Sequence, residues 1–178
     1  MSLAIRDMFD RIAPSYDALN RALSVGIDQR WRRRAIASLG DLEGRDVLDL
    51  CAGTLDVAAL IAGRFPRARV LAADFSRAML KRGQAARGHR DARLVPCQAD
   101  ALDLPARDAA FFAAVCAFGV RNLDDPERGL CEVARVLEPG GRFAVRRGPG
   151  DAPRAGPRDR GARARDVPAR PGDRALSL

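Results

Sequence analysis

The segment from Asp46 to Asp56, which reads DVLDLCAGTLD, constrains the fold of this chain more than any other stretch. The mainly apolar run Val47–Leu50 ends at a turn of small residues, Cys51–Thr54, and apolar residues with helical spacing follow over Val57–Phe65. Strand, tight turn and helix in this order open a βαβ unit, in which a ligand meets the carboxyl end of the strand and the N-terminus of the helix. Small residues suit such a turn because they let a ligand approach the backbone closely. The segment therefore predicts a ligand site beside the first strand of a parallel sheet.

Asp74 narrows this prediction to a nucleoside ligand. It closes the apolar run Val70–Ala73, about 20 residues after the turn, where a nucleoside-binding fold needs a carboxylate for the ribose hydroxyls. A structural turn without a ligand is the alternative, because turns that contain glycine are common. Together, the small-residue turn and Asp74 favour the nucleoside site.

Strands and helices alternate after Gly44, which predicts a parallel sheet with helices on both faces. The expected strands are Asp46–Leu50, Arg69–Asp74, Arg93–Gln98, Phe111–Phe118 and Arg142–Val145. The expected helices are Asp56–Phe65, Ser76–Ala86 and Pro126–Leu137. Ser76 and the acidic pair Asp124–Asp125, which precedes Pro126, are expected to cap the last two helices, and Pro139–Gly141 is expected to end the final one.

The N-terminal residues 1–40 predict further helices. Apolar residues recur at i, i+3, i+4 and i+7 spacing before Pro14, at Ile5, Met8, Phe9 and Ile12. A second helical pattern carries Trp31, Ala35, Ile36 and Leu39. This segment is either an amphipathic layer packed on the sheet or a lid that closes over a substrate, and the periodicity does not choose between them.

Composition limits the class of protein. A chain of 178 residues with 47% hydrophobic residues suits one globular domain. No apolar run approaches the roughly 20 residues that span a bilayer, and the N-terminus lacks a secretory apolar segment, so a cytoplasmic location is expected. Four dispersed cysteines and one histidine predict buried free thiols, with no metal site and no disulfide framework.

The last part of the sequence differs from the rest. The range Arg146–Leu178 holds nine arginines and four aspartates, which is five of the eight excess positive charges of the chain. It lacks apolar periodicity, so we expect a disordered tail at 146–178, with a basic arm for nucleic acid as the alternative. Residues 1–145 are expected to form the domain, with a helical lid at 1–40 and an α/β core at 44–145. No specific nucleic-acid partner is expected for that domain.

Several motifs, in order and spacing, resemble those of the class I S-adenosylmethionine methyltransferases. They are VLDLCAGTLD, LAADFSRAMLKRG, QADALDLP and AFGVRNLDDPERGLCEVARVLEPGGRF. More narrowly, the N-terminal MFDRIAPSYDALNRALSVGIDQRWRRRA and the FGVRNL stretch resemble the ubiquinone/menaquinone biosynthesis C-methyltransferases. The resemblance runs from about Met8 to Val145.

This resemblance implies a Rossmann-like α/β fold with an N-terminal helical lid and the cofactor S-adenosyl-L-methionine. It implies methylation of a ring carbon of a polyprenylated quinol, from demethylmenaquinol to menaquinol or on the benzoquinol of the ubiquinone pathway. Another small-molecule methyltransferase of the same fold and an inactive cofactor-binding remnant are the alternatives. A peripheral membrane contact, to reach the lipid substrate, and a homo-oligomer are left open.

The resemblance also assigns roles to individual residues. It implies cofactor contacts at Gly53, Thr54, Asp74, Asp100, Ala101 and Ala117. It implies that Arg121 and Asn122 form a catalytic pair, that Tyr16 contacts the substrate, and that no metal takes part. From the residues alone, Thr54 is equally a helix cap, Asp100 a turn residue and Arg121 part of a solvated loop.

Two departures from the family pattern bear on activity. Leu55 stands where the family has glycine, and a left-handed conformation there would cost leucine about 1–2 kcal/mol and crowd the cofactor. At the other end, the family sequence continues beyond Val145 into further strands and helices. The change to an Arg/Pro/Gly-rich tail resembles a reading-frame shift, so the final antiparallel hairpin is expected to be missing and the last strand to form an exposed edge.

Overall fold

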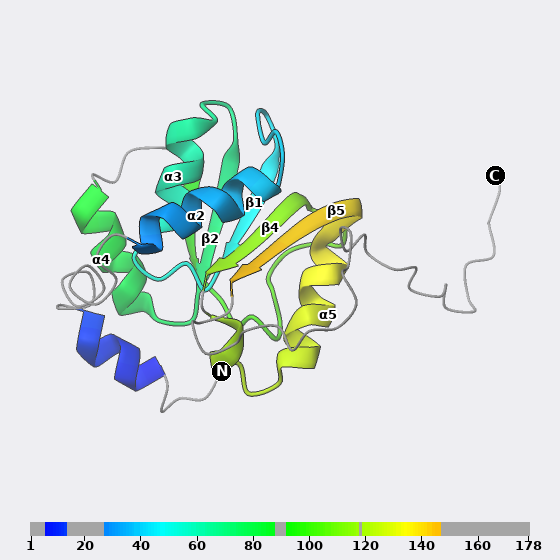
Figure 1. Cartoon of the computed structure of the whole chain (residues 1–178). Coiled ribbons are helices and arrows are strands. Elements are labelled where there is room, and N and C mark those ends of the chain that lie inside the picture. The colour runs from blue at the N-terminus through cyan, green and yellow to red at the C-terminus, as the bar shows by residue number, and fades with distance from the viewer. Residues whose placement is uncertain (1–5, 14–26, 88–91, 118, 147–178) are drawn as a thin grey trace, which may run out of the picture.

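The computed structural model describes residues 6–13, 27–87, 92–117 and 119–146 (Figure 1). A helical segment covers residues 6–13. The other helices are α2 (Ile27–Ser38), α3 (Asp56–Arg64), α4 (Arg77–Arg87), the 3₁₀ turn η1 (Val120–Asn122) and α5 (Pro126–Val136). The strands are β1 (Asp46–Leu50), β2 (Arg69–Asp74), β3 (Leu94–Gln98), β4 (Phe111–Ala117) and β5 (Leu137–Arg146).

The five strands form one parallel sheet in the order β3-β2-β1-β4-β5. The chain therefore winds outward from β1 to β3 and then crosses to the other side of β1 to form β4. In such doubly wound sheets a ligand binds beyond the carboxyl ends of the strands, at the point where the strand order reverses. Here this point lies between β1 and β4, which pair from Val47 opposite Ala113 to Leu50 opposite Cys116.

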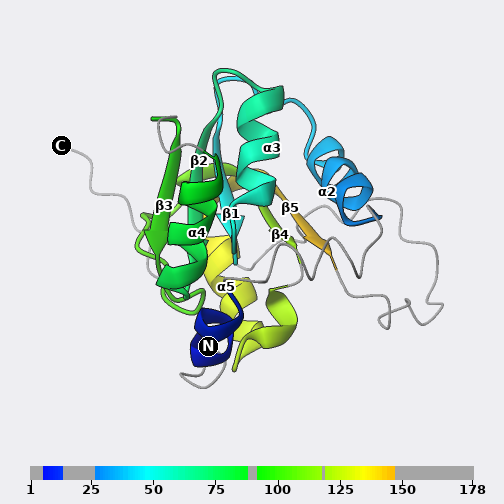
Figure 2. The same ribbon diagram turned by 90° about the vertical axis from the view of Figure 1, so that its left-hand side faces the viewer.

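Each face of the sheet carries its own cluster of buried apolar side chains. One cluster joins Ile36 of α2, Ile61 of α3 and Leu80 of α4 to the sheet. The other joins Val133 and Val136 of α5 to the opposite face. Figures 1 and 2 show these helices around the sheet. The predicted Rossmann-like α/β fold with helices on both faces is thereby confirmed.

The predicted capping residues are confirmed by hydrogen bonds. The Ser76 hydroxyl accepts the backbone N–H of Met79 at 3.1 Å, at the start of α4. The Asp125 carboxylate accepts the backbone N–H of Arg128 at 2.9 Å, and Pro126 occupies the first turn of α5. Both side chains satisfy N–H groups that an α-helix leaves unpaired at its start.

The prediction for the last strand was wrong at its beginning. Strand β5 starts at Leu137, directly after α5, and Leu137 already pairs with Phe111 of β4. The Pro139–Gly141 segment therefore does not end the helix. It forms an irregularity inside the strand, because the register shifts between Phe111 and Ala113 and Gly140 adopts φ +80°. Beyond this point β5 forms one edge of the described sheet, and the expected tail falls outside the described residues from position 147.

The two N-terminal helical segments contact different parts of the molecule. Helix α2 packs on the sheet through Ile36, and its Arg32 forms an ion pair with Asp56 of α3 at 2.6 Å. By contrast, the segment at residues 6–13 reaches the loop after β2, where the Ser76 hydroxyl donates to the Asp10 carboxylate. Helix α2 therefore forms the amphipathic layer on the sheet, which was one of the two alternatives for residues 1–40. The segment at 6–13 lies beside Asp74.

Candidate cofactor and substrate site

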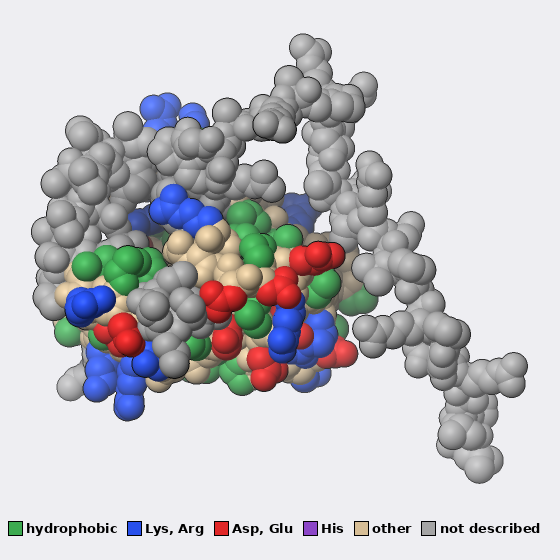
Figure 3. Space-filling model, turned by 90° about the horizontal axis from the view of Figure 1, so that it is seen from below, with side chains coloured by type: hydrophobic (Ala, Val, Ile, Leu, Met, Phe, Trp, Pro, Cys, Tyr) green, Lys and Arg blue, Asp and Glu red, His purple; other side chains and the backbone are tan. Residues whose placement is uncertain are grey.

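The site is built from the loops that follow β1, β2, β3 and β4 at the carboxyl ends of these strands. Figure 3 views this side of the molecule, where acidic and apolar side chains lie together with arginines among them. The loop after β1 takes an unusual path, because Cys51, Gly53 and Leu55 all have positive φ, at 55°, 54° and 64°. Alternating left-handed residues curl the backbone tightly before α3 begins at Asp56. Two of the three are not glycine, so this turn is under backbone strain.

Asp74 joins the β1 loop to the β2 loop. Its Oδ2 accepts the backbone N–H of Gly53 at 2.8 Å, and its Oδ1 accepts that of Ser76 at 2.8 Å. The side chain is 9% exposed, and burial raises the pKa of Asp74, against these hydrogen bonds and with a smaller contribution from Asp10. Each carboxylate oxygen has a second lone pair, so Asp74 can hold both loops and still accept hydrogen bonds from two hydroxyls of a ligand.

Asp49 is a polar residue of this region that sequence reasoning did not single out. It lies within β1, is 1% exposed, and its Oδ2 accepts the backbone N–H of Ala58 in the first turn of α3 at 2.9 Å. Burial raises the pKa of Asp49 from 3.8 to about 7, opposed by the Ala58 hydrogen bond. The signal was present in the sequence as an acidic residue inside an apolar strand, since such a residue needs a buried partner.

A small cavity lies between the ends of β1 and β2 and the loop after β3. Its volume is about 10 Å³, and it is lined by Leu50, Cys51, Ala73, Asp74, Phe75, Ala99, Ala101 and Leu123. This is room for about one water, whereas ligand pockets typically measure some 300–1,000 Å³. The small cavity by itself does not hold a nucleoside, and Asp74 forms part of its wall.

The structure brings the predicted cofactor residues to this one edge of the sheet. Ala101 is 6% exposed and lines the small cavity with Asp74. The Asp100 Oδ1 accepts the backbone N–H of Leu102 at 3.0 Å, which is the turn role weighed for it above. Thr54 is buried at 2% exposure, and Ala117 ends β4.

The predicted catalytic pair lies on η1, directly after β4. Arg121 is exposed and Asn122 is half-buried. The next residue, Leu123, lines the small cavity, whereas Arg121 and Asn122 do not. In the described part of the chain, Arg121 forms no hydrogen bond with Asp74, the predicted ribose ligand, so the two predicted roles fall on separate side chains. Tyr16 falls outside the described residues.

Leu55 adopts the left-handed conformation that the sequence analysis considered, but its side chain does not face the small cavity. It is 2% exposed and belongs to the cluster of α2, α3 and α4. A Cβ at Gly83 of α4 would lie 2.8 Å from the Leu55 Cγ and 2.5 Å from the Thr54 carbonyl, so α4 packs directly on this turn. The expected backbone strain is present, and the packing offsets it by burying the leucine.

Cys51 also depends on a nearby glycine. A Cβ at Gly119 would lie 2.2 Å from the Cys51 Cβ and 2.3 Å from its Sγ. The hydrogen bond with Cys116, together with burial, raises the pKa of the Cys51 thiol. These surroundings favour the neutral thiol of Cys51, which occupies the space beside Gly119. The prediction of buried thiols is confirmed for Cys116 and is wrong for Cys131, which is exposed, while Cys51 and Cys97 are half-buried.

Replacing Gly119 by Ala is expected to destabilise the protein by about 1–3 kcal/mol, because the new methyl group overlaps Cys51. In a Cys51→Gly background the same change should cost less than about 1 kcal/mol, since the overlapping atoms are gone and glycine accepts the positive φ. Urea unfolding of the four proteins measures this coupling. An equal cost in both backgrounds would show that Cys51 does not limit the space at Gly119.

No group of three or more His, Cys, Asp or Glu side chains in the described ranges could hold a metal ion. No described helix is long and apolar enough to cross a membrane.

The family and the relatives that this chain resembles are all methyltransferases. The ubiE/COQ5 methyltransferase family matches residues 2–147. A demethylmenaquinone methyltransferase from Thermus thermophilus is 46% identical over 78% of this chain and 63% of its own length. One from Deinococcus radiodurans is 43% identical over 80% of this chain and 59% of its own length. The chain thus spans about three fifths of these curated relatives.

Among solved structures, a SAM-dependent methyltransferase from Aquifex aeolicus superposes with a TM-score of 0.57 at 20% identity. The match covers 64% of this chain and 62% of that protein. At this identity the likeness concerns the fold alone.

Proposed function

Because the chain belongs to the ubiE/COQ5 methyltransferase family, we propose that it transfers a methyl group from S-adenosyl-L-methionine to a ring carbon of a polyprenylated quinol. Demethylmenaquinol is the proposed acceptor, given the names of its similar relatives. The observation that carries the proposal is Asp74 at the end of β2, hydrogen-bonded at 2.8 Å to Gly53 in the loop after β1. A buried carboxylate beside a tight turn is the arrangement that recognises a ribose.

In this proposal the cofactor is held along the edge formed by the ends of β1, β2 and β4. Asp74 accepts the two ribose hydroxyls, and the Gly53–Thr54 backbone lies under the methionine moiety. Asp100 and Ala101 border the adenine, and Ala117 lies near the sulfonium. When bound, S-adenosyl-L-methionine supplies an electrophilic methyl group.

The residues of η1 activate the acceptor. A quinol ring carbon becomes nucleophilic when the neighbouring hydroxyl is ionised, so the site must stabilise a phenolate. The Arg121 guanidinium supplies a fixed positive charge and Asn122 an amide donor at that oxygen. Arg121 is not the base, since guanidinium keeps its proton up to a pH of about 12. The phenolic proton passes to water. After the ring carbon has gained the methyl group, the hydrogen on that carbon leaves as a proton to water, which restores the aromatic ring. Tyr16 is proposed to contact the substrate.

Positioning supplies the rest of the rate enhancement. Holding the methyl group in line with the ring carbon can contribute about 7–11 kcal/mol. Residues 1–145 are proposed to form the methyltransferase domain, with residues 1–40 as its helical cover and 146–178 as a separate tail. The contact between Asp10 and Ser76 supports a cover, because it holds the segment at 6–13 beside Asp74.

The test is calorimetry with S-adenosyl-L-methionine. Asp74→Ala should weaken binding by about 10²- to 10⁴-fold, because each of the two charge-assisted hydrogen bonds contributes some 1.5–3 kcal/mol. Asp41→Ala is the matched control, since Asp41 is an exposed acid in the turn before β1. Circular dichroism must accompany it, because Asp74 also holds Gly53 and Ser76. Unchanged affinity in a folded Asp74→Ala protein would place the cofactor elsewhere.

A cofactor-binding protein without methyl transfer is the second candidate. Binding of S-adenosyl-L-methionine without methylation of demethylmenaquinol would support this candidate. Methylation of a different small molecule would support another methyltransferase of the same fold.

A further inference from the structure

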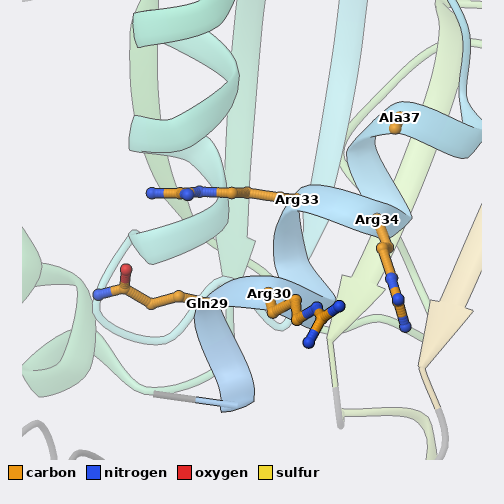
Figure 4. A pocket seen from close by; sticks show the side chains of 5 residues that line it. All are labelled: Gln29, Arg30, Arg33, Arg34 and Ala37. Carbon is orange, nitrogen blue, oxygen red and sulfur yellow. The ribbon is translucent and has the colours of Figure 1, made fainter.

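The outer face of α2 carries a concentration of positive charge that the proposed reaction does not use. Arg30, Arg33 and Arg34 are exposed there. With Gln29 and Ala37 they line a hollow of about 510 Å³ (Figure 4). In the close-up their side chains extend away from the helix axis in different directions, so the three guanidinium groups spread over the face.

The opposite face of α2 fixes the helix to the domain and leaves these three arginines available. Ile36 is 1% exposed in the core, and Arg32 pairs with Asp56 at 2.6 Å. Among the side chains that the structure describes, which do not include Asp28, no carboxylate forms an ion pair with Arg30, Arg33 or Arg34. Three positive charges therefore spread over the outer face of a helix that is attached to the domain by its inner side.

Trp31 adds an aromatic ring at the border of this basic face. Its exposed fraction is 42%, and the Arg34 guanidinium lies 5.9 Å from the ring centroid. Exposed tryptophan beside arginine is the combination found where proteins touch the headgroup region of a bilayer, because the indole is apolar with one polar N–H and arginine pairs with phosphate.

We propose that the outer face of α2 binds the surface of a bilayer that contains anionic phospholipids. Headgroup phosphates occupy the hollow between Arg30, Arg33 and Arg34, and Trp31 enters the interface beside them. The inference rests on the proposed function, since a polyprenylated quinol is dissolved in the bilayer and the enzyme must come to it. It goes further by assigning the contact to one helix and by requiring negative charge in the lipid.

The chain offers a direct probe, because Trp31 is its only tryptophan. The full-length protein is titrated with vesicles of phosphatidylcholine alone and with vesicles that also contain about one third phosphatidylglycerol. With the anionic vesicles, Trp31 emission should shift to shorter wavelength and be quenched by brominated acyl chains. No shift and no quenching on vesicles that do bind the protein would show that another surface makes the contact.

Two triple variants test whether the arginines of α2 are the ones that bind anionic vesicles. The triple variant Arg30→Gln, Arg33→Gln, Arg34→Gln should bind anionic vesicles at least about tenfold more weakly, since each arginine near such a surface contributes roughly a fivefold change in affinity. Its matched control is the triple variant Arg64→Gln, Arg107→Gln, Arg128→Gln, which removes the same charge from exposed sites on other elements. Equal losses in both variants would overturn the proposal, because net charge would then explain binding. Tighter retention by RNA than by anionic vesicles, lost in the α2 variant only, would overturn it in favour of nucleic acid.

Two further measurements separate this inference from the proposed function. Calorimetry with S-adenosyl-L-methionine and methylation of the quinol in detergent micelles do not need a bilayer. Methylation in micelles with unchanged vesicle binding by the α2 variant would disprove only the membrane surface. Loss of vesicle binding in that variant, with no cofactor binding by the wild type, would disprove only the methyltransferase.

Discussion

Replacing Asp49 by Asn is expected to stabilise the protein by a few kcal/mol at pH 8 and to remove a pH dependence from its stability. Burial raises the pKa of Asp49 from 3.8 to about 7. Between these values the unfolded chain releases the proton and the folded protein keeps it, so stability falls as the pH rises. The loss is about 1.4 kcal/mol per pH unit, or on the order of 4 kcal/mol in total, and it persists above pH 7.

Asparagine resembles the protonated acid in shape and hydrogen bonding. Its carbonyl can accept the Ala58 N–H that the Asp49 carboxylate accepts now at 2.9 Å. The measurement is the free energy of urea unfolding of both proteins from pH 4 to 8. The difference between them should be small at pH 4 and should grow up to about pH 7. Asp103→Asn, at an exposed acid, is the control that should show no such growth. A destabilised Asp49→Asn protein at pH 8 would mean that the ionised carboxylate stabilises the fold.

Replacing Arg121 by Ala is expected to lower kcat for quinol methylation by about 10²–10³-fold while cofactor affinity stays near the wild-type value. The expected size is that for loss of one group that stabilises charge developing in a transition state. Since Arg121 is exposed on η1, its removal should leave the free energy of unfolding within about 0.5 kcal/mol of wild type. Steady-state kinetics, calorimetry and urea unfolding on one preparation test the three statements together.

Two variants sharpen the interpretation of Arg121. Arg121→Lys keeps the charge but loses the forked geometry, so it should recover only part of the rate. Arg107→Ala removes another exposed arginine and should keep wild-type kcat. If Arg121→Ala methylates the quinol at the wild-type rate, the positive charge that stabilises the phenolate comes from a different residue.

The sequence was sufficient for the elements whose cause is local. Strands β1 and β2 match their predicted bounds, because each is a short apolar run closed by a polar or small-residue turn. The caps at Ser76 and Asp125 were predictable for the same reason, since a capping side chain bonds to an N–H two or three residues away. The family was readable from motif order, and the match over residues 2–147 confirms it.

The tertiary structure decided whatever depends on neighbours distant in the sequence. The Pro139–Gly141 segment looks like a helix stop, yet pairing of Leu137 with Phe111 draws it into β5. Leu55 looks like an obstruction in the cofactor turn, yet Gly83 of α4 leaves room for its side chain in the core.

Asp49 shows in a single residue what the sequence predicts and what only the tertiary structure decides. The sequence places an acid in a strand, but burial beneath α3 determines its partner and its pKa. Periodicity and motif spacing report how a segment folds with its neighbours in the chain. Electrostatics, strain and available space depend on which segments meet, so only the assembled sheet and helices fix them.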